Sequence, residues 1–568
     1  MSEIPKVQRA LVLQGGGALG AYEAGVLKTL YKKLTIEDEE KDKKGKKGGL
    51  LFDIVAGTSI GAINGAVLVS NVISREKSWK SAVDTLEHFW IDESKETEED
   101  KGGLASTIDI DKLSSLDPWQ KDEEWYEKQN AASKEAARRY YSAKMLFLSG
   151  APNVHKLLPV RPDFRFLDNS DFNKWFIHNS EPLEKSIKRY CGNNDKNNNK
   201  KSKIFTSWDK KQPRLLVVAV DVAEGKTVTF DSYKKIKDYR KSGHENHSNT
   251  KGQENYGMKS EDNGITMDHV MASGTLPEFY DYRYINGRKF WDGGLLSNTP
   301  FRELLQAHQD YWMDVISQQD EDGKVPDLEV YIVNLHPSKC ANPPDDHDGT
   351  KDRLNDITFF DRNSHFDENM SYLVTDYTDF VIRMKDIAMN AISKISNGND
   401  KAKLQEKLEA ILETTAHSKS NKEEYLKYKD LLKGRFELTK VIRIERTNYI
   451  NSIWLKGGDF TSETIKKLIK EGESDAWVIL IEQDVKNLPL PDDNIGIKDI
   501  LIEHLHQALE YLKNDDFQDD AYMYAYNKLT EFICQTDRNK LVIDRLKSGQ
   551  SDDLIKSAEM FKTSLEQR

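Results

Sequence analysis

The chain has 568 residues, enough for about three or four domain-sized units at roughly 150 residues each. Its 83 Lys and Arg against 95 Asp and Glu leave a formal net charge of −12, which argues against a dedicated nucleic-acid binder, because such proteins rely on clustered positive charge. Hydrophobic residues make up 38% and charged residues 31%, a composition that excludes a polytopic membrane protein and favours a soluble chain with a polar surface.

Cysteine content and the amino terminus both bear on the compartment. The three cysteines, Cys191, Cys340 and Cys534, are far apart and odd in number, so they support neither a disulfide framework nor a zinc site. The amino-terminal stretch has one short apolar run before glycines interrupt it, which is too little for a secretory signal. We therefore expect a cytoplasmic protein.

The first 70 residues predict alternating strands and helices. Residues 9–14 favour a short buried strand, and residues 21–34 place their apolar side chains on one helical face. A second strand is predicted over 50–57 and a buried helix over 60–69. This order, with a turn between each strand and its helix, is typical of a mostly parallel sheet covered by helices.

One segment imitates a membrane helix. Residues 54–74 carry no charge, and Gly57, Gly61 and Gly65 follow one another at four-residue spacing. Polar residues interrupt the segment, however, and a buried strand followed by a turn and a helix accounts equally well for the same residues. We favour the buried interpretation.

The rest of the chain predicts an interrupted sheet followed by a different kind of region. Residues from about 75 to 205 form an aromatic-rich helical insertion or cap, and a polar mobile loop is expected over about 233–263. Further buried strands are predicted over 215–222, 227–232 and 327–336. Beyond about 355 the chain is charged and helix-patterned, apart from a strand candidate over 441–446.

The first motif with chemical meaning is a glycine-rich turn, QGGGALG, over residues 14–20. Consecutive glycines between a strand and a helix let backbone N–H groups point outward beside the positive end of the helix, which suits bound negative charge. Gly15, Gly17 and Gly20 also match a dinucleotide-binding pattern. That pattern expects an acidic residue closing the second strand, whereas Asp53 lies near its start, so we disfavour a nucleotide site.

The second motif, GTSIG over residues 57–61, sets a serine at another turn from strand to helix. A nucleophile on such a sharp turn needs small neighbours, and Gly57 and Gly61 satisfy that need around Ser59. Ser59 as a simple helix cap is an equally good interpretation of this motif alone.

The third motif combines MASGTLPEFY, residues 271–280, with INGRKFWDGGLLSNTP, residues 285–300, in which Asp292, Gly293 and Gly294 form a turn. Alone it indicates only a structural turn after a short strand. Together the three motifs supply a serine nucleophile beside a set of N–H donors, the arrangement of an oxyanion hole. The missing part is a base, and a carboxylate in direct hydrogen-bond reach can take the serine proton without a histidine.

This spaced set resembles the patatin-like phospholipase family over roughly residues 8–340. The resemblance implies a three-layer α/β/α core with a mostly parallel sheet, an inserted cap and a helical carboxy-terminal extension over 355–568. It implies Ser59 as nucleophile and Asp292 as general base of a Ser–Asp dyad, with Gly57, Gly61, Gly293 and Gly294 supporting the two motifs. The backbone of Gly15, Gly16, Gly17 and Ala18 would form the oxyanion hole. The implied reaction is hydrolysis of lipid acyl esters through an acyl-enzyme, with no metal or other cofactor.

One departure from the family concerns the substrate. Many members carry Arg or Lys in the glycine turn where this chain has Leu19, which weakens a preference for phosphate head groups more than ester hydrolysis itself. Phospholipid, lysophospholipid, neutral glyceride and storage polyester oligomers all remain open as substrates. Transient contact with a membrane surface through apolar cap residues is compatible with this function and needs no anchor. The sequence leaves the oligomeric state open.

Two rival interpretations fit parts of the sequence. The chain order Ser59, Asp292, His336 matches a histidine triad of the α/β-hydrolase kind, although the early glycine turn fits the dyad better. The long carboxy-terminal part could alternatively make the protein a non-catalytic scaffold, against which the intact serine, aspartate and glycines argue. His269 is expected to be a packed or capping residue, and His504 and His506 do not share a helical face.

Overall fold

The three-dimensional structure is a computed structural model of the full chain. It describes residues 4–43, 50–74, 78–91, 104, 138–140, 142–143, 150–151, 153–157, 178–191, 203–233, 264–277, 279–319, 324–340, 343–419, 425–446, 453 and 455–486. Most of the predicted insertion over 75–205, the predicted loop beyond residue 233, and the carboxy-terminal residues that include His504, His506 and Cys534 lie outside these ranges.

An eight-stranded, mostly parallel sheet forms the centre of the molecule. Its main path runs β10-β11-β7-β2-β1-β12-β15, and β8 also pairs with β7. The strands β2, β7, β1, β12 and β15 pair in parallel, whereas β8, β10 and β11 pair antiparallel. Their bounds are β1 Val7–Leu13, β2 Ile54–Thr58, β7 Arg214–Asp221, β8 Lys226–Asp231, β10 Arg283–Ile285, β11 Arg288–Asp292, β12 Asp327–Asn334 and β15 Leu438–Glu445.

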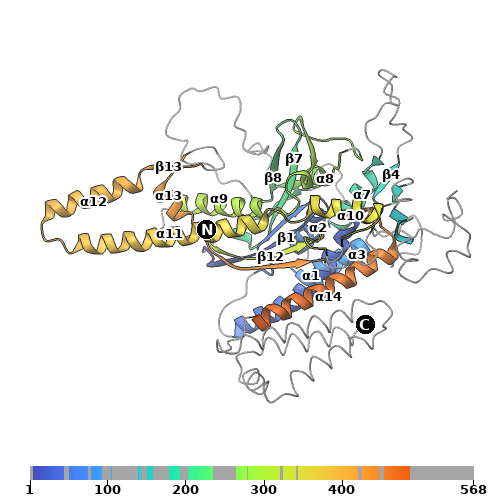
Figure 1. The fold of residues 1–568 in the computed structure, drawn as a ribbon, viewed down its shortest axis with the longest axis horizontal. Coiled ribbons are helices and arrows are strands. Elements are labelled where there is room, and N and C mark those ends of the chain that lie inside the picture. Colours follow the sequence, from blue (N-terminus) through green and yellow to red (C-terminus); the bar gives the residue numbers. More distant parts are fainter. Residues whose placement is uncertain are drawn as a thin grey trace, which may run out of the picture.

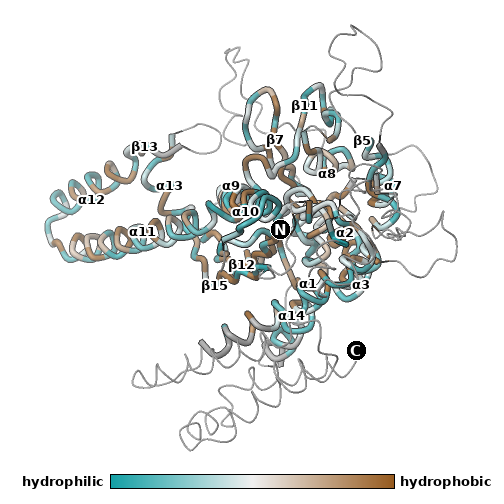
Figure 2. Tube along the Cα trace, turned by 45° about the vertical axis from the view of Figure 1, so that its right-hand side comes forward, coloured by the Kyte–Doolittle hydropathy of each residue, from teal (hydrophilic) through white to brown (hydrophobic). Residues whose placement is uncertain are grey.

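Helices cover both faces of this sheet, which confirms the expected three-layer α/β/α fold (Figure 1). Alternate residues of each buried strand point to opposite layers. Leu11 and Val55 pack in one apolar core with the helices α1 Gly20–Lys43, α2 Ile60–Ser74, α3 Trp79–Trp90 and α14 Ser462–Lys486. Ala10 and Ile54 pack in a second core against α9 Phe301–Gln319. Figure 2 shows hydrophobic segments gathered along these central elements.

Several smaller elements lie in the part of the chain that follows β2 and precedes β12. Within the described residues of this segment, β3, β4 and β5 form one short sheet and β6 and β9 form another, with the helices α7 and α8 near them (Figure 1). Their bounds are β3 Gly150–Ala151, β4 His155–Leu157, β5 His178–Asn179, β6 Lys203–Ile204, β9 Ile265–Thr266, α7 Glu181–Tyr190 and α8 Met267–Ser273.

The chain beyond residue 340 both joins the core and projects from it. The strand β15 pairs with β12 at the edge of the central sheet, and α14 packs on α1 through close backbone approaches at Gly25 and Gly472. By contrast, α11 Ser364–Ser393 and α12 Gly398–Leu412 extend away from the body as a helical arm (Figure 1). The division into a core over 8–340 and an extension over 355–568 stays a prediction. The other elements here are α10 His347–Phe359, β13 Thr415–Lys419, β14 Tyr425–Lys427 and α13 Tyr428–Lys433.

The uncharged segment 54–74 forms strand β2, a sharp turn and helix α2, as we favoured from the sequence. Within the described part of the chain, no helix has the length and apolar character needed to cross a membrane. The strand starts at Ile54 rather than at residue 50. The reason lies at Asp53, whose side chain accepts a 2.7 Å hydrogen bond from the Arg9 amide and anchors the chain just before the ladder begins.

Candidate active site

Ser59 occupies the turn between β2 and α2, and its backbone is strained. Its φ of 55° lies in the left-handed region that residues with a side chain rarely adopt. A methyl group on Gly57 would collide with the backbone of Gly61, and one on Gly61 would collide with the backbone of Leu13. Both glycines are therefore required for the turn to close, as expected for an elbow that presents a serine side chain.

Asp292 ends strand β11 and is almost completely buried, with an exposed fraction of 1%. Its Oδ1 accepts a 2.7 Å hydrogen bond from the Gly294 amide, while its buried Oδ2 has no hydrogen-bond partner of ordinary geometry among the described residues. Burial raises the pKa of Asp292 to about 7, and the nearby Ser59 hydroxyl and the Gly294 amide, as hydrogen-bond donors, partly oppose that rise. The carboxyl is thus tuned to exchange protons near neutral pH.

The glycine turn lies directly beside Ser59. A methyl group on Gly15 would sit 3.0 Å from Ser59 Cβ, so the backbone of the turn and the serine are in contact. The Gly15 amide is already engaged, since it donates to Asn298 O at 3.2 Å. The amides of Gly16, Gly17 and Ala18 make no backbone hydrogen bond within the described residues, and they precede α1 at its positive end.

The third motif also contacts the elbow. A methyl group on Gly293 would lie 3.0 Å from Thr58 Cγ2, and the Thr58 hydroxyl donates to Ser297 O at 2.9 Å. The three predicted motifs therefore meet in space around Ser59, where the glycine turn and Asp292 both approach it.

Two supporting side chains were not singled out from the sequence. Ser273 accepts a 2.8 Å hydrogen bond from the Ser59 amide and donates to Val218 O at 2.5 Å, which fixes the elbow against β7. Asn298 donates to Gly15 O at 3.1 Å and to Phe359 O at 2.8 Å. Both lie inside the third motif, so the signal was present in its serine and asparagine letters, although their targets depend on the fold.

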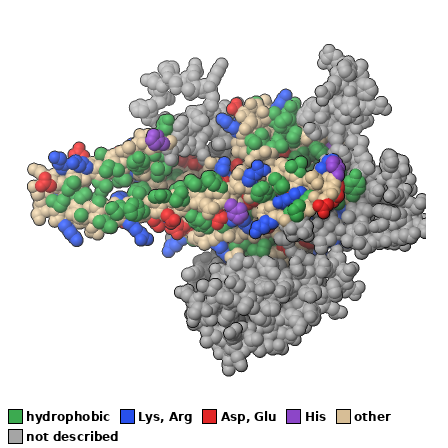
Figure 3. All heavy atoms as spheres, in the orientation of Figure 1, with side chains coloured by type: hydrophobic (Ala, Val, Ile, Leu, Met, Phe, Trp, Pro, Cys, Tyr) green, Lys and Arg blue, Asp and Glu red, His purple; other side chains and the backbone are tan. Residues whose placement is uncertain are grey.

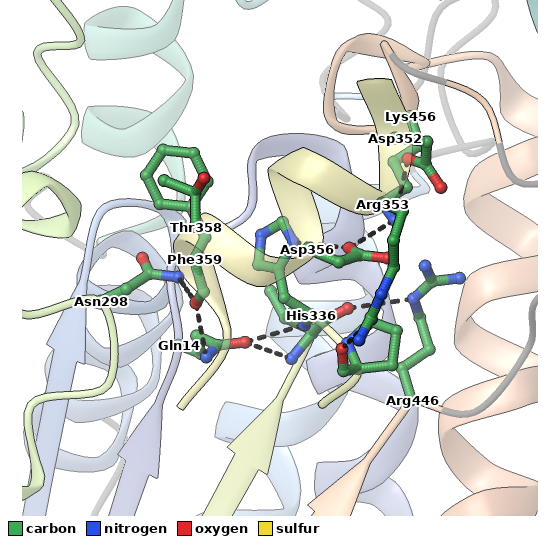
Figure 4. Close-up of polar contacts among 12 residues, drawn as sticks. Gln14, Asn298, His336, Asp352, Arg353, Asp356, Thr358, Phe359, Arg446 and Lys456 are labelled. Carbon is green, nitrogen blue, oxygen red and sulfur yellow. Dashed lines mark hydrogen bonds and ion pairs between the residues drawn. The ribbon is translucent and has the colours of Figure 1, made fainter. Parts of the chain in front are cut away.

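A polar network braces the end of β1 where the glycine turn begins (Figure 4). The Gln14 Oε1 accepts from the amides of Leu335 at 2.6 Å and His336 at 2.9 Å, and its Nε2 donates to Thr299 Oγ1 at 2.8 Å. Gln14 thus joins the ends of β1 and β12 to the segment that follows Asp292. The turn is held by a fully bonded buried amide rather than by the chain path alone.

His336 belongs to a separate buried cluster. Its Nδ1 lies 3.1 Å from Asp356 Oδ1, and Lys456 Nζ contacts Asp356 at 2.5 Å and Asp352 at 3.0 Å (Figure 4). Burial lowers the pKa of His336. The contacts that its ring makes in the described structure are to Asp356 and Phe359, not to Ser59 or Asp292, so no histidine triad is assembled.

The buried lysine brings the carboxy-terminal part of the chain onto the glycine turn. A methyl group on Gly457 would lie 3.0 Å from Gly16 O, and Gly17, with φ of 60°, has no room for a side chain because the Gly457 carbonyl fills that space. Lys456, itself fully buried, anchors this contact to α10 through its two aspartates. The segment over 456–458 is therefore a backstop for the turn.

The remaining sequence expectations concern single residues. Leu19 is fully buried, and its side chain packs in the apolar core rather than lining the site. His269 caps α8, where its Nδ1 accepts from the Thr266 amide at 2.9 Å, and it packs on Phe230, as expected. Within the described ranges, no group of three or more His, Cys, Asp or Glu side chains could hold a metal ion.

Known proteins were compared with this chain. A family model described as Patatin-like phospholipase matches residues 11–305, more than half of the chain and the whole span from the glycine turn to Asp292. The structure of VipD from Legionella pneumophila is 15% identical over 97% of this chain and 88% of its own, with a TM-score of 0.24. The ExoU–SpcU complex of the type III secretion system of Pseudomonas aeruginosa is 14% identical over 99% and 89%, with a TM-score of 0.22.

Such low identities and TM-scores carry no argument, and among curated proteins none matches the chain. The family match stands on its own, because its length is sufficient and it contains all three motifs. The chain belongs to the patatin-like phospholipase family.

Proposed function

We propose that this protein hydrolyses lipid acyl esters through an acyl-enzyme on Ser59, with Asp292 as its general base. Family membership supports a lipid acyl hydrolase in general. The observation that carries the finer proposal is the Asp292 carboxyl, which is buried near Ser59 on its strained elbow. Its Oδ2 has no hydrogen bond of ordinary geometry within the described residues, and burial raises its pKa to about 7. A base with a pKa near the working pH is the most effective proton acceptor.

In the first half-reaction the Ser59 oxygen attacks the ester carbonyl carbon while its proton passes to Asp292. The carbonyl oxygen becomes an oxyanion, for which the amides of Gly16, Gly17 and Ala18 are the available donors. Collapse of this intermediate breaks the bond to the alcohol, which leaves with the proton from Asp292. The acyl group is then esterified to Ser59.

In the second half-reaction water replaces the alcohol. Asp292 takes a proton from the attacking water, the same amides hold the second oxyanion, and Ser59 leaves with the proton that Asp292 returns. The products are a carboxylic acid and the regenerated enzyme. Neither half-reaction calls for a metal ion, because proton transfer and oxyanion binding are both supplied by the chain.

The ester class follows from the turn. Leu19 is buried in the apolar core and offers no positive charge to a substrate phosphate, so we expect hydrolysis without a strict requirement for a phosphate group. Phosphatidylcholine, lysophosphatidylcholine, a diacylglycerol and a hydroxyalkanoate oligomer should be compared at matched acyl length. Turnover confined to the phosphate-bearing esters would contradict this part of the proposal.

Labelling with a fluorophosphonate probe tests the nucleophile directly. We expect the folded wild-type protein to be labelled and Ser59→Ala to be unlabelled, with Ser317→Ala as a control because Ser317 is an exposed serine on α9. Circular dichroism should show that all three proteins are folded. Labelling that persists in folded Ser59→Ala would assign the nucleophile elsewhere, and absence of both labelling and ester turnover in the wild type would favour a scaffold.

A further inference from the structure

Helix α11 carries an apolar stripe that nothing in the described structure covers. Along it, large apolar residues recur at alternating spacings of four and three for nearly four heptads. The exposed fraction is 65% at Tyr377 and 62% at Phe380, in the middle of the stripe. We call this set the α11 seam: Phe366, Met370, Leu373, Tyr377, Phe380, Met384, Ile387 and Ala391.

The opposite side of α11 is already used inside the chain. There Thr375 donates to Phe436 O at 3.2 Å, and Asp379 and Glu368 form ion pairs with Arg435 and Arg443. Figure 3 shows hydrophobic side chains gathered in a row along the projecting arm, in contrast to the mixed surface of the body. A contiguous apolar surface of this extent on a folded protein marks a docking site.

The period of the seam indicates what docks. A strict alternation of four and three residues is the pattern of a helix that packs along a second helix with interlocking side chains. If a second α11 runs antiparallel over the first, Tyr377 of each copy faces Phe380 of the other, and Leu373 faces Met384. Met370 then faces Ile387 at both ends. Every seam residue obtains an apolar partner in this one register.

The residues that flank the seam agree with the same register. Asp376 and Arg383 lie on one edge of the stripe, one heptad apart, and neither forms an ion pair within the described chain. In the antiparallel pairing Asp376 of each copy faces Arg383 of the other, which makes two opposite-charge pairs. On the other edge Val374 faces Val381 of the second copy, and both are exposed in the single chain. Charge and shape therefore select one arrangement.

From this complementarity we propose that the α11 seam is the interface of a symmetric dimer, in which α11 of two copies of this chain pack antiparallel about a centre between Tyr377 and Phe380. A lipid surface fits the stripe less well. Helices that lie in a membrane interface carry Lys and Arg on their polar face, whereas α11 carries five acidic residues (Asp367, Glu368, Asp376, Asp379 and Asp386) against only Arg383 and Lys385.

A matched pair of substitutions tests the surface. Met384 is in the seam and Met389 lies on the other side of the same helix, with exposed fractions of 51% and 42%. Sedimentation velocity of the full chain from about 1 to 100 µM should show a dimer for the wild type and for Met389→Glu. Met384→Glu places two charges in the interface and should weaken dimerisation about 100-fold or more. Matching far-ultraviolet circular dichroism spectra would show that both variants are folded, since the melting temperature itself changes with dimerisation.

A charge exchange tests the register. Asp376→Arg and Arg383→Asp each turn both flanking pairs into like-charge contacts and should weaken their own dimers about tenfold. An equimolar mixture of the two variants restores both opposite-charge pairs, so it should form a heterodimer as readily as the wild type dimerises. Failure of the mixture to associate, when each variant alone is weakened, would overturn the antiparallel register.

The lipid alternative is tested with the same proteins. Sedimentation with phosphatidylcholine vesicles should show no difference between Met384→Glu and Met389→Glu. A wild-type chain that stays monomeric to 100 µM would overturn the proposal, and in that case vesicle binding lost only in Met384→Glu would assign the seam to a lipid surface. Neither outcome depends on ester turnover, so the dimer and the proposed hydrolase function can fail separately.

Discussion

Two regions of the molecule differ in how their residues are used. In the glycine turn and the elbow at Ser59, every residue contacts another part of the same chain, whereas on the helical arm of α11 and α12 many apolar side chains contact nothing in the described structure. Around Ser59 each small residue is enforced by a backbone approach, and Gln14, Ser273 and Asn298 satisfy the polar groups of the turns. On the arm, apolar side chains face outward over most of a 30-residue helix. The residues of the first region find all their partners within one chain. The exposed apolar residues of the second region need a partner molecule, which we propose to be a second copy of the chain.

That contrast predicts how each region answers to substitution. A change near Ser59 should alter chemistry or folding, because every neighbour is in contact with another. A chemically similar change on the arm should leave both untouched and alter association alone.

The largest effect is expected at the base. Asp292→Asn should lower ester turnover about 10³-fold or more, because Ser59 loses its proton acceptor. Asp386→Asn on the arm is the matched control and should turn over ester at the wild-type rate. The Asn variant should melt no lower than the wild type at pH 8, since ionised Asp292 is costly in its buried position. Near-normal turnover in folded Asp292→Asn would exclude this carboxylate as the base.

The next effect concerns the backstop of the glycine turn. Lys456→Met should lower the free energy of unfolding by about 3–5 kcal/mol, because it leaves Asp352 and Asp356 buried without their cation. Lys403→Met, at an exposed position on α12, should change it by about 0.5 kcal/mol or less. Urea unfolding followed by fluorescence measures both. Equal stability of the two variants would show that the buried lysine is not needed to hold the carboxy-terminal segment.

The pH dependence of turnover gives an intermediate effect. A general base acts only when unprotonated, and burial places the pKa of Asp292 at about 7, so kcat/KM should rise with pH through neutrality and then level off. Well below pH 7 the fall should approach tenfold per pH unit, which makes about 50-fold between pH 7 and pH 5. A flat profile over this range in a protein that stays folded would contradict a base with a raised pKa.

The smallest effect on chemistry is expected at His336. Because its ring is bonded to Asp356 and not to the dyad, His336→Ala should keep ester turnover within a few fold of the wild type while losing some stability. Turnover and melting temperature should be measured on the same preparation. A loss comparable to that of Asp292→Asn, with the fold intact, would restore the triad.

The fold of the site region was largely predictable, because tight turns require glycine and buried strands require apolar residues, and both can be recognised in the sequence. The glycines around Ser59 and the apolar strand residues before each turn are required by local geometry, whatever the rest of the fold. The motifs therefore predicted the positions of β1, β2, α2 and β11 to within a few residues. The polar partners were harder: Asn298 and Ser273 could be read in their motif, but their targets at Gly15 and Ser59 exist only after folding.

The carboxy-terminal part illustrates the opposite case. Residues 441–446 predicted a strand correctly as part of β15, yet nothing in a strand's alternation says which strand it pairs with. The close packing of α14 on α1 depends on Gly25 and Gly472, which are separated by most of the chain. The heptad spacing of α11 was visible in the letters, but that its apolar side faces outward is a property of the tertiary structure alone.

The contact of Gly457 with Gly16 and Gly17 has a consequence for biosynthesis. The chain is made from its amino terminus, so the turn beside Ser59 emerges first and its backstop emerges more than 400 residues later. Non-local contacts of this kind form late in folding. A nascent chain that already carries Ser59 and Asp292 still lacks the segment that fills the space behind the turn. We therefore expect the proposed hydrolytic activity to appear only after residues 456–458 have been synthesised and have packed against the turn.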